Sequence, residues 1–217
     1  MISILLATYN GEKYIRQSID SVMSQTFTDW TLLVGFNGTT DSSKDIVASY
    51  GDNRIVTYDY GDDKGKAKTL NKLLANARDS WCAIQDDDDI WHPQKLEKQM
   101  AVADSFDVVG TQIRYINEEN QVIGGPFLAT DYARIKQLSL GGTNQVANSS
   151  AIFRRSYAKL IGGWDETLDG IEDFDFWLKI MRVTESKFFN YADVLCFHRV
   201  HQESNFNTKK YDIGNIL

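Results

Sequence analysis

The strongest constraint on the fold is a regular alternation, through the first half of the chain, of short apolar runs with amphipathic stretches of helical period. The apolar runs predict strands over Ile2–Ala7, Trp30–Gly35, Arg54–Asp59 and Trp81–Gln85. The stretches after them predict helices over Glu12–Gln25, Ser43–Tyr50, Lys66–Arg78 and from Pro93 onward. Consecutive β-α units favour a mostly parallel sheet covered on both faces. Because ligands of such sheets bind beyond the carboxyl ends of the strands, we expect a site there.

The second half of the chain breaks this alternation. Val108–Ile116 and Val122–Ile123 flank a turn-forming run at 117–120, a pattern that predicts an antiparallel hairpin. Further elements are predicted as a helix near Tyr132–Leu138, a strand near Ala151–Phe153, a helix near Asp173–Val183 and a strand near Val194–Phe197. No Gly/Ser linker separates the halves, so we expect one α/β domain over residues 1–217 with a mixed second half.

Charge and composition exclude several classes of function. The 217 residues include 23 basic and 30 acidic side chains, a net charge of −7. This balance argues against a nucleic-acid partner, since such proteins neutralise phosphates with Lys and Arg. Cys82 and Cys196 lie far apart in apolar runs, so neither a disulfide framework nor a zinc site is expected. The N-terminal apolar run ends at Thr8 without the basic flank of a signal peptide, and no run approaches the ~20 apolar residues of a membrane span. We expect a soluble, cytoplasmic protein with no integral membrane segment.

The loop after the fourth predicted strand, Asp86–Asp89, holds four consecutive carboxylates. Two unit charges ~4 Å apart repel by about 4 kcal/mol at an effective dielectric of ~20, so the cluster is costly unless a cation binds it. Asp86 and Asp88 project to the same side of an extended chain, and carboxylate oxygens suit Mg²⁺ or Mn²⁺, which also bind phosphates. The alternative is a solvated loop that favours the helix starting near Pro93, although charge–dipole effects fade beyond the first turn.

Other templates for metal or phosphate binding do not match. A calcium EF-hand starting at Asp86 needs Gly at its sixth position, where this chain has Trp91. The run 61–66 has its glycines too close together for a Walker loop and lacks the following Ser or Thr. The sequence contains no Gly-x-Gly-x-x-Gly motif. Nucleotide binding through a glycine cradle is therefore unsupported, whereas binding through a carboxylate-held cation stays open.

Seven short motifs follow one another along residues 2–205. They are Ala7–Tyr14, Ser21–Phe27, Asn37–Asp41, Asp86–Pro93 with Lys95–Glu97, Gly162–Asp165, Glu172–Asp173 and Arg199–His201. In this order they resemble the family-two glycosyltransferases of the GT-A fold, which transfer a sugar from a nucleotide diphosphate. The resemblance implies a single GT-A domain with a mostly parallel, Rossmann-like sheet. It also implies a nucleotide-binding half over 1–105 and an acceptor-binding half over 106–217.

On the donor side, the resemblance implies a metal site and a nucleoside pocket. Asp86-x-Asp88 matches the family's metal-binding motif, with Asp88 as the direct ligand and Asp86 closer to the ribose. His201 completes the metal site or touches the diphosphate, although a lone His is more often a surface or core residue. Lys68 matches a Lys of a rhamnosyltransferase-like branch and faces the diphosphate, unless it is an ordinary exposed helical Lys. The residues implied in the nucleotide-sugar pocket also include Ala7, Thr8, Tyr9, Asn37 and Asp87.

On the acceptor side, the resemblance implies that Glu172 and Asp173 are the catalytic acidic pair, with Asp173 as the general base. Inverting transfer needs one carboxylate that takes the proton of the attacking hydroxyl. The alternative is that both acids only favour a helix N-terminus. Trp164, in a loop after two glycines, is the candidate for stacking on the acceptor sugar. Trp177 is expected to pack in the core.

The sequence departs from the family pattern in two places. Many members carry two acids where this chain has Phe36-Asn37, so stacking of Phe36 on the nucleobase is an alternative to hydrogen bonding there. The chain also ends soon after His201, where relatives continue with further helices. It is therefore either a minimal catalytic module or part of a longer protein.

The function implied is a Mn²⁺- or Mg²⁺-dependent, inverting transfer of a sugar from a UDP-sugar to a glycan or other hydroxyl acceptor. One alternative is a non-catalytic nucleotide-sugar-binding module, which would use Asp86 and Asp88 but not Asp173. A nucleotidyltransferase of the same fold would need a Gly-rich, Arg-containing N-terminal loop, which the run 8–12 lacks. A calcium-dependent carbohydrate-binding module would bind sugar without nucleotide.

Overall fold

The computed structural model describes residues 1–168, 170–183 and 185–201. Its sheet has the strand order β3-β2-β1-β4-β8-β6-β9-β5, and β7 pairs with β6. The strands are β1 Ile2–Thr8, β2 Trp30–Phe36, β3 Ile55–Asp59, β4 Trp81–Ile84, β5 Ile90–Trp91, β6 Val108–Ile116, β7 Val122–Gly124, β8 Ile152–Arg154 and β9 Phe188–Arg199. β1 is parallel to β2 and β4, whereas β8 is antiparallel to both β4 and β6. The prediction of an α/β fold with a mostly parallel first half and a mixed second half is confirmed.

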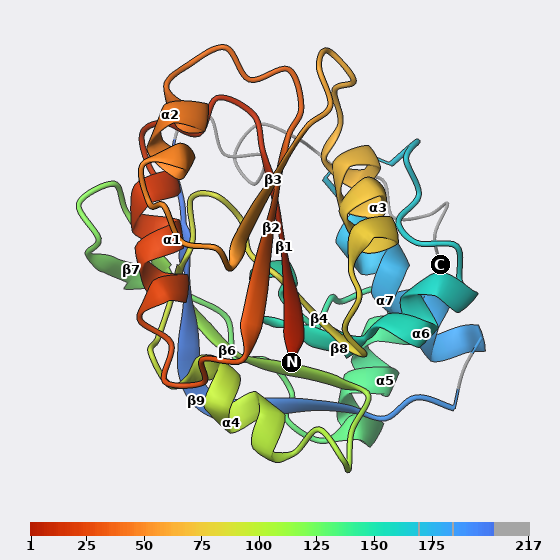
Figure 1. Ribbon diagram of the computed structural model, residues 1–217. Helices are drawn as coiled ribbons and strands as arrows, with labels where there is room; N and C mark the ends of the chain where they lie inside the picture. The colour runs from red at the N-terminus through yellow and green to blue at the C-terminus, as the bar shows by residue number, and fades with distance from the viewer. Residues whose placement is uncertain (169, 184, 202–217) are drawn as a thin grey trace.

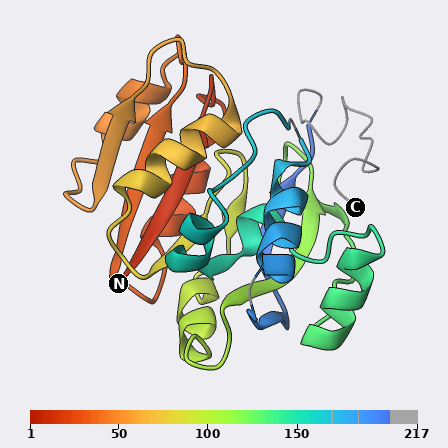
Figure 2. The ribbon, with the colours of Figure 1, turned by 90° about the vertical axis from the view of Figure 1, so that its right-hand side faces the viewer.

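Helices cover both faces of the parallel strands. They are α1 Ile15–Met23, α2 Ser43–Ala48, α3 Lys66–Asn76, α4 Lys95–Ala101, α5 Tyr132–Leu140, α6 Arg155–Leu160 and α7 Glu172–Val183, with a short 3₁₀ turn η1 at Asn148–Ser150. In Figure 1, α1 and α2 lie on one side of β1–β3, and α3, α6 and α7 lie on the other. The turned view in Figure 2 shows α3 (yellow), α6 (teal) and α7 (blue) together on one face.

The alternation of side chains along β1 explains this double cover. Ile4 and its neighbours two positions away pack in one apolar cluster with Ile19 of α1. Leu5 points the other way and packs in a second cluster with Leu73 of α3 and Trp177 of α7. Each residue named is buried, so the strand is apolar on both faces, as a parallel strand between helical layers must be.

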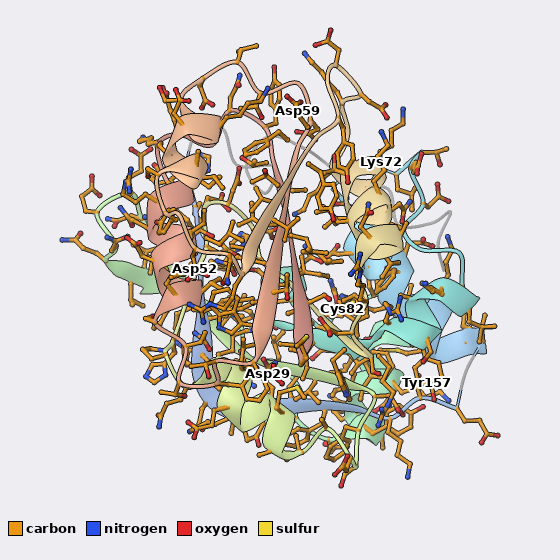
Figure 3. The ribbon with its side chains drawn as sticks, in the orientation of Figure 1. Asp29, Asp52, Asp59, Lys72, Cys82 and Tyr157 are labelled. Atoms are coloured by element: carbon orange, nitrogen blue, oxygen red, sulfur yellow. The ribbon has the colours of Figure 1, made fainter. Side chains whose placement is uncertain are left out.

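The carboxyl ends of the parallel strands all lie at one end of the molecule. Figure 3 labels Asp59, the last residue of β3, at the top, and Asp29, which precedes β2, at the bottom. The loops that follow β1, β2, β3 and β4 therefore meet at the top edge of the sheet, which is where the sequence predicted a site.

The structure differs from the sequence-based elements at a few places. The predicted strand Val194–Phe197 is only part of β9, because the register with β6 shifts near Gln112 and the inward–outward alternation is lost there. The short elements β5 and α6 were not predicted, since two or six residues carry little periodicity. Across the described residues, no helix combines the length and apolar character needed to cross a membrane.

Candidate active site

A cleft of about 970 Å³ opens at the carboxyl ends of β1, β2 and β4 and extends over the second half of the sheet. Its walls come from segments that are far apart in the sequence. The structure brings together there ten of the predicted site residues: Ala7, Thr8, Tyr9, Asn37, Asp86, Asp87, Asp88, Glu172, Asp173 and His201. Lys68 and Trp164 are not among the lining residues.

The aspartate loop, Asp86–Asp89, is held from below by buried polar groups. Asp89 is fully buried, and its carboxylate accepts a hydrogen bond from the backbone N–H of Arg199 at 2.9 Å. The fully buried Arg199 side chain donates through Nε to the carbonyl of Asp88 at 2.9 Å. His198 Nδ1 lies 3.2 Å from Asp89, and although burial opposes it, this carboxylate raises the pKa of His198 to about 9. The loop backbone is thus fixed by β9.

Asp88 and His201 form a pair in the wall of the cleft. His201 Nε2 lies 3.1 Å from Asp88 Oδ2. Burial favours the neutral acid, but hydrogen bonding to His201 and the positive charges of His198 and Lys66 outweigh it and lower the pKa of Asp88. Asp88 is therefore an ionised carboxylate at neutral pH.

The donor set of this pair fits a divalent cation that shares its coordination with a ligand. Over the described ranges 1–168, 170–183 and 185–201, no three His, Cys, Asp or Glu side chains converge as a complete metal site. Mg²⁺-type ions, however, are usually held by one or two protein carboxylates plus substrate phosphates rather than by an all-protein cage. Asp88 with His201 offers that partial set of ligands.

Asp87 is turned away from this pair toward the end of β1. Its Oδ2 accepts a hydrogen bond from the hydroxyl of Thr8. A Cβ atom on Gly11 would clash with the same oxygen and with the Thr8 hydroxyl, so a larger residue there would displace this pair. Burial, and next the charge of Asp88, raise the pKa of Asp87 to about 7. Consecutive aspartates in one loop thus have different environments and different protonation.

Lys66, which the sequence analysis did not single out, lines the cleft together with Lys13 and Lys64. Its Nζ lies 2.6 Å from Asp86 Oδ1. Burial disfavours its charge, but the carboxylates of Asp86, Glu172 and Asp173 raise its pKa, so it stays protonated.

The assignment of Lys68 to the cleft is wrong in this structure. Lys68 pairs instead with Asp63 at 3.2 Å, and its side chain is 42% exposed. Residues two apart on a helix point in nearly opposite directions, so only one of Lys66 and Lys68 can face the cleft. The available signal was the position of Lys66, the first helical residue after Gly65, whose φ of 131° turns the chain into α3.

Glu172 and Asp173 lie at the first turn of α7. The Glu172 side chain accepts from the N–H of Gly170 at 2.5 Å, and Asp173 Oδ1 accepts from the N–H of Phe174 at 2.7 Å. Asn144 Nδ2 lies 3.3 Å from the other Asp173 oxygen. Burial, followed by the nearby charge of Glu172, raises the pKa of Asp173 to about 7. A carboxyl group with this pKa can accept a proton near neutral pH and release it again.

Asn37 and Tyr9, which follow β2 and β1, also line the cleft. Asn37 is only 5% exposed, and its Oδ1 has no hydrogen-bond partner among the described residues. Tyr9 is 49% exposed, with Lys64 Nζ 5.0 Å from its ring centre. The alternative in which Phe36 stacks on a nucleobase is wrong, because Phe36 is 3% exposed and packs in the core with Val34.

Trp164 does not form an acceptor platform. Its indole is 2% exposed and stacks on Phe176, with ring centres 4.2 Å apart. The Gly162-Gly163 turn that precedes it directs the side chain inward, because Gly163 has φ 81° and lies against Asn71. The prediction of acceptor stacking by Trp164 is therefore wrong, whereas the expected packing of Trp177 is confirmed.

The segment 144–149 is a second part of the cleft wall, after Lys66, that the sequence analysis did not predict. Asn144, Asn148 and Ser149 all line the cleft. The segment contains only common polar residues before a short strand, so no periodicity or motif marked it.

Comparisons with known proteins agree with this fold. The WfgD protein of Escherichia coli, named UDP-Glc:alpha-D-GlcNAc-diphosphoundecaprenol beta-1,3-glucosyltransferase, is 28% identical over 215 residues, covering 96% of this chain and 81% of that protein. S. aureus TarS in complex with UDP-GlcNAc superposes with a TM-score of 0.80 at 19% identity, covering 99% of this chain and 63% of TarS. The mannosyltransferase PcManGT of Pyrobaculum calidifontis, in complex with GDP-Man and Mn²⁺, gives a TM-score of 0.71 at 18% identity, covering 93% and 57%. At these identities the two structures show the shared fold.

The chain spans between 32% and 66% of the length of several curated Rickettsia relatives that it matches. A family model covers a longer stretch of the chain than any single motif. The model described as glycosyl transferase family 2 matches residues 3–162, well over half of the chain. With the sheet order and the aspartate loop in place, the chain belongs to glycosyl transferase family 2.

Proposed function

We propose that this chain is a metal-dependent, inverting glycosyltransferase that moves a sugar from a nucleotide diphosphate sugar, with UDP favoured, to a hydroxyl group of a glycan acceptor. The observation that carries the proposal is a pair of carboxylates with opposite proton affinities in one cleft. The pKa of Asp88 is lowered beside His201, whereas that of Asp173 is raised to about 7. Carboxylates separated in this way supply one permanent anion and one proton carrier.

The donor diphosphate is assigned to the Asp88 end of the cleft. Asp88 and His201 would hold a divalent cation, which when bound neutralises charge on the phosphate oxygens. Lys66 adds a protein cation at the same end, next to Asp86. The orphan amide oxygen of Asn37 can accept a hydrogen bond from the N–H of a nucleobase such as uracil.

The proton of the acceptor hydroxyl is assigned to Asp173. An ionised Asp173 takes this proton as the hydroxyl oxygen attacks the anomeric carbon. Attack from the side opposite the leaving diphosphate inverts the configuration and requires no covalent intermediate. Glu172 keeps the local potential negative, which strengthens the affinity of Asp173 for the proton.

The relatives support the donor class. TarS is described with UDP-GlcNAc, WfgD is named for UDP-Glc, and PcManGT is described with GDP-Man and Mn²⁺. Two of the three names carry uridine, which favours UDP, and the third favours Mn²⁺ among the divalent ions. Cytoplasmic placement stays a prediction from the sequence.

A donor-cleavage assay tests the proposal. UDP-glucose, UDP-galactose, UDP-N-acetylglucosamine and GDP-mannose are incubated with the protein, with and without Mn²⁺, and release of the nucleotide diphosphate is followed. We expect turnover with Mn²⁺ and at least one donor. Asp88→Asn should lose both turnover and Mn²⁺-dependent nucleotide binding, whereas Asp173→Asn should lose turnover and keep binding.

The matched control is Asp45→Asn, an exposed acid on α2 that lies outside the cleft. Wild-type rates in both cleft variants would disprove the assigned roles. The non-catalytic binding module would be favoured by a different result. In that case the wild type and Asp173→Asn bind the nucleotide equally well, and the wild type releases no nucleotide diphosphate from any donor, even when simple sugars are added as acceptors.

A further inference from the structure

We propose that Asn148 is a specificity-determining residue that accepts a hydrogen bond from a ring hydroxyl of the donor sugar; this inference rests on the proposed function. Asn148 lines the cleft, and its Oδ1 is buried without a hydrogen-bond partner among the described residues. Buried polar atoms in native structures are nearly always paired, so an orphan acceptor in a cleft calls for a ligand donor.

The sheet places Asn148 beside the aspartate loop. β4 and β8 are antiparallel neighbours, with Ala83 opposite Ile152. Continuing this register past the end of β4 brings Asp86 next to Ser149, and the Asp86 N–H indeed faces the Ser149 hydroxyl at 3.4 Å. The residue before Ser149 therefore stands next to the side chain of Asp86.

The 3₁₀ turn that carries Asn148 is itself fixed. The indole N–H of Trp91 donates to the carbonyl of Ser149 at 2.7 Å, and Gln99 donates to the carbonyl of Ser150 at 2.8 Å. Trp91 and Gln99 are both buried. A side chain on a rigid turn can hold a ligand with little loss of entropy, which suits discrimination between similar sugars.

The carboxylate of Asp86 determines which atom of the Asn148 amide has no hydrogen-bond partner. Asn148 Nδ2 lies 3.4 and 3.5 Å from the two oxygens of Asp86. A flipped amide would place its oxygen against a group that only accepts hydrogen bonds. The oxygen is therefore the atom left over, and a sugar hydroxyl is a donor that can satisfy it.

The position also matches where a sugar ring must lie. Asn144, four residues earlier, reaches the proposed base Asp173, while Asn148 reaches Asp86. The segment between them thus crosses from the base toward the end of the cleft assigned to the diphosphate. In an in-line transfer the anomeric carbon lies between the base Asp173 and the leaving diphosphate near Asp88. The sugar ring that contains this carbon therefore lies beside the segment that joins the two ends, which carries Asn148.

Calorimetric titration tests this assignment without requiring turnover. With Mn²⁺ present, the Kd of UDP, UDP-glucose, UDP-galactose and UDP-N-acetylglucosamine is measured for the wild type and Asn148→Ala. We expect the wild type to bind one sugar nucleotide about tenfold tighter than its least favoured relative. Asn148→Ala should reduce that ratio to about twofold, with the Kd of UDP itself changed less than twofold.

The control is Asn76→Ala, an exposed residue at the end of α3 whose amide donates to the Lys72 carbonyl. It should leave every Kd unchanged. An unchanged ratio in Asn148→Ala, an equal loss for UDP and all sugar nucleotides, or a wild type without preference among the sugars would each overturn the inference. Failure of the wild type to bind any of these nucleotides would instead reject the proposed function.

Discussion

The two ends of the cleft hold their carboxylates in different ways. At the aspartate-loop end, Asp88 is fastened through its carbonyl by buried Arg199 and through its side chain by His201. At the base end, Asp173 begins a helix and contacts the Phe174 N–H and, at 3.3 Å, Asn144. Burial favours the neutral form of both carboxyl groups, so burial does not distinguish them. The neighbouring charges distinguish them, because two histidines and a lysine lower the pKa of Asp88, whereas Glu172 helps to raise the pKa of Asp173.

The largest expected effect is on the free energy of unfolding, which should fall much more for a change at the aspartate-loop end than for one at the base end. Arg199→Met would leave two half-buried carbonyls at the aspartate-loop end without their donor, those of Asp88 and Asn117, each 2.9 Å from the fully buried guanidinium, and would also remove its contact with the exposed Gln17. A carbonyl that stays unsatisfied away from water costs about 1–3 kcal/mol, so we expect the free energy of unfolding to fall by about 2–5 kcal/mol. Urea denaturation followed by circular dichroism measures this loss.

The matching change at the base end is Asn144→Ala, which removes a long hydrogen bond to the Asp173 side chain and the amide oxygen that accepts from the Val146 N–H at 3.0 Å. It should cost about 1 kcal/mol, less than the loss in Arg199→Met. Comparable losses in the two variants would show that both ends are fastened alike. Arg199→Lys is not expected to rescue, because an ammonium group cannot reproduce the several directions in which the guanidinium donates.

The second effect is the pH dependence of turnover. Asp173 must be ionised to accept a proton, and its pKa is raised to about 7 by burial and Glu172. The kcat should therefore rise about tenfold per pH unit well below 7 and level off above it, a change of about 50-fold between pH 5 and pH 7. Initial rates in overlapping buffers, with saturating donor and Mn²⁺, measure the profile.

Asp173→Asn is the control for this profile, since it has no ionisable group at that position. Its residual rate should lose the rise near pH 7. A wild-type rate that stays level from pH 5 to pH 8 would argue that another group takes the proton.

The third effect compares two lysines on one helix. Lys66→Met removes the cation beside Asp86, so the affinity for UDP should fall about tenfold, in line with a charge-assisted contact to a phosphate. Lys68→Met removes a cation that pairs with Asp63 outside the cleft and should change the affinity less than twofold. Calorimetry with UDP and Mn²⁺ tests both; the reverse order would restore Lys68 to the site.

How far the sequence predicts the site depends on the kind of signal. The aspartate loop is visible because consecutive carboxylates are costly and follow a predicted strand, whereas the acids at 172–173 are indicated only by the family resemblance. The start of α3 at Lys66 was predicted correctly, whereas the choice of Lys68 rested on the resemblance. Which face of this helix meets the cleft depends on tertiary packing, which the local pattern does not specify. The direction of Trp164 depends on two glycines with positive φ, which the sequence allows but does not require. Asn148 is brought to Asp86 by strand pairing between distant segments, which no local pattern encodes.

The smallest effect concerns stability at the base end. A carboxyl group whose pKa is raised by folding, here Asp173 from 3.8 to about 7, keeps its proton in the folded state while the unfolded chain has lost it. Asp173 therefore does not lower the free energy of unfolding below pH 4, and it lowers this free energy progressively as the pH rises through 7. Asp173→Asn carries no charge at any pH and should be more stable than the wild type at pH 8 by about 1 kcal/mol. This is less than the full shift would give at about 1.4 kcal/mol per unit, since water in the cleft screens the charge.

Urea unfolding at pH 5 and pH 8 measures the difference in stability between the two proteins, which should shrink toward pH 5, with Asp45→Asn as the exposed control. A variant that is less stable than the wild type at pH 8 would mean that Asp173 is stabilised as an anion, in the same way as Asp88, and the contrast between the two ends of the cleft would disappear.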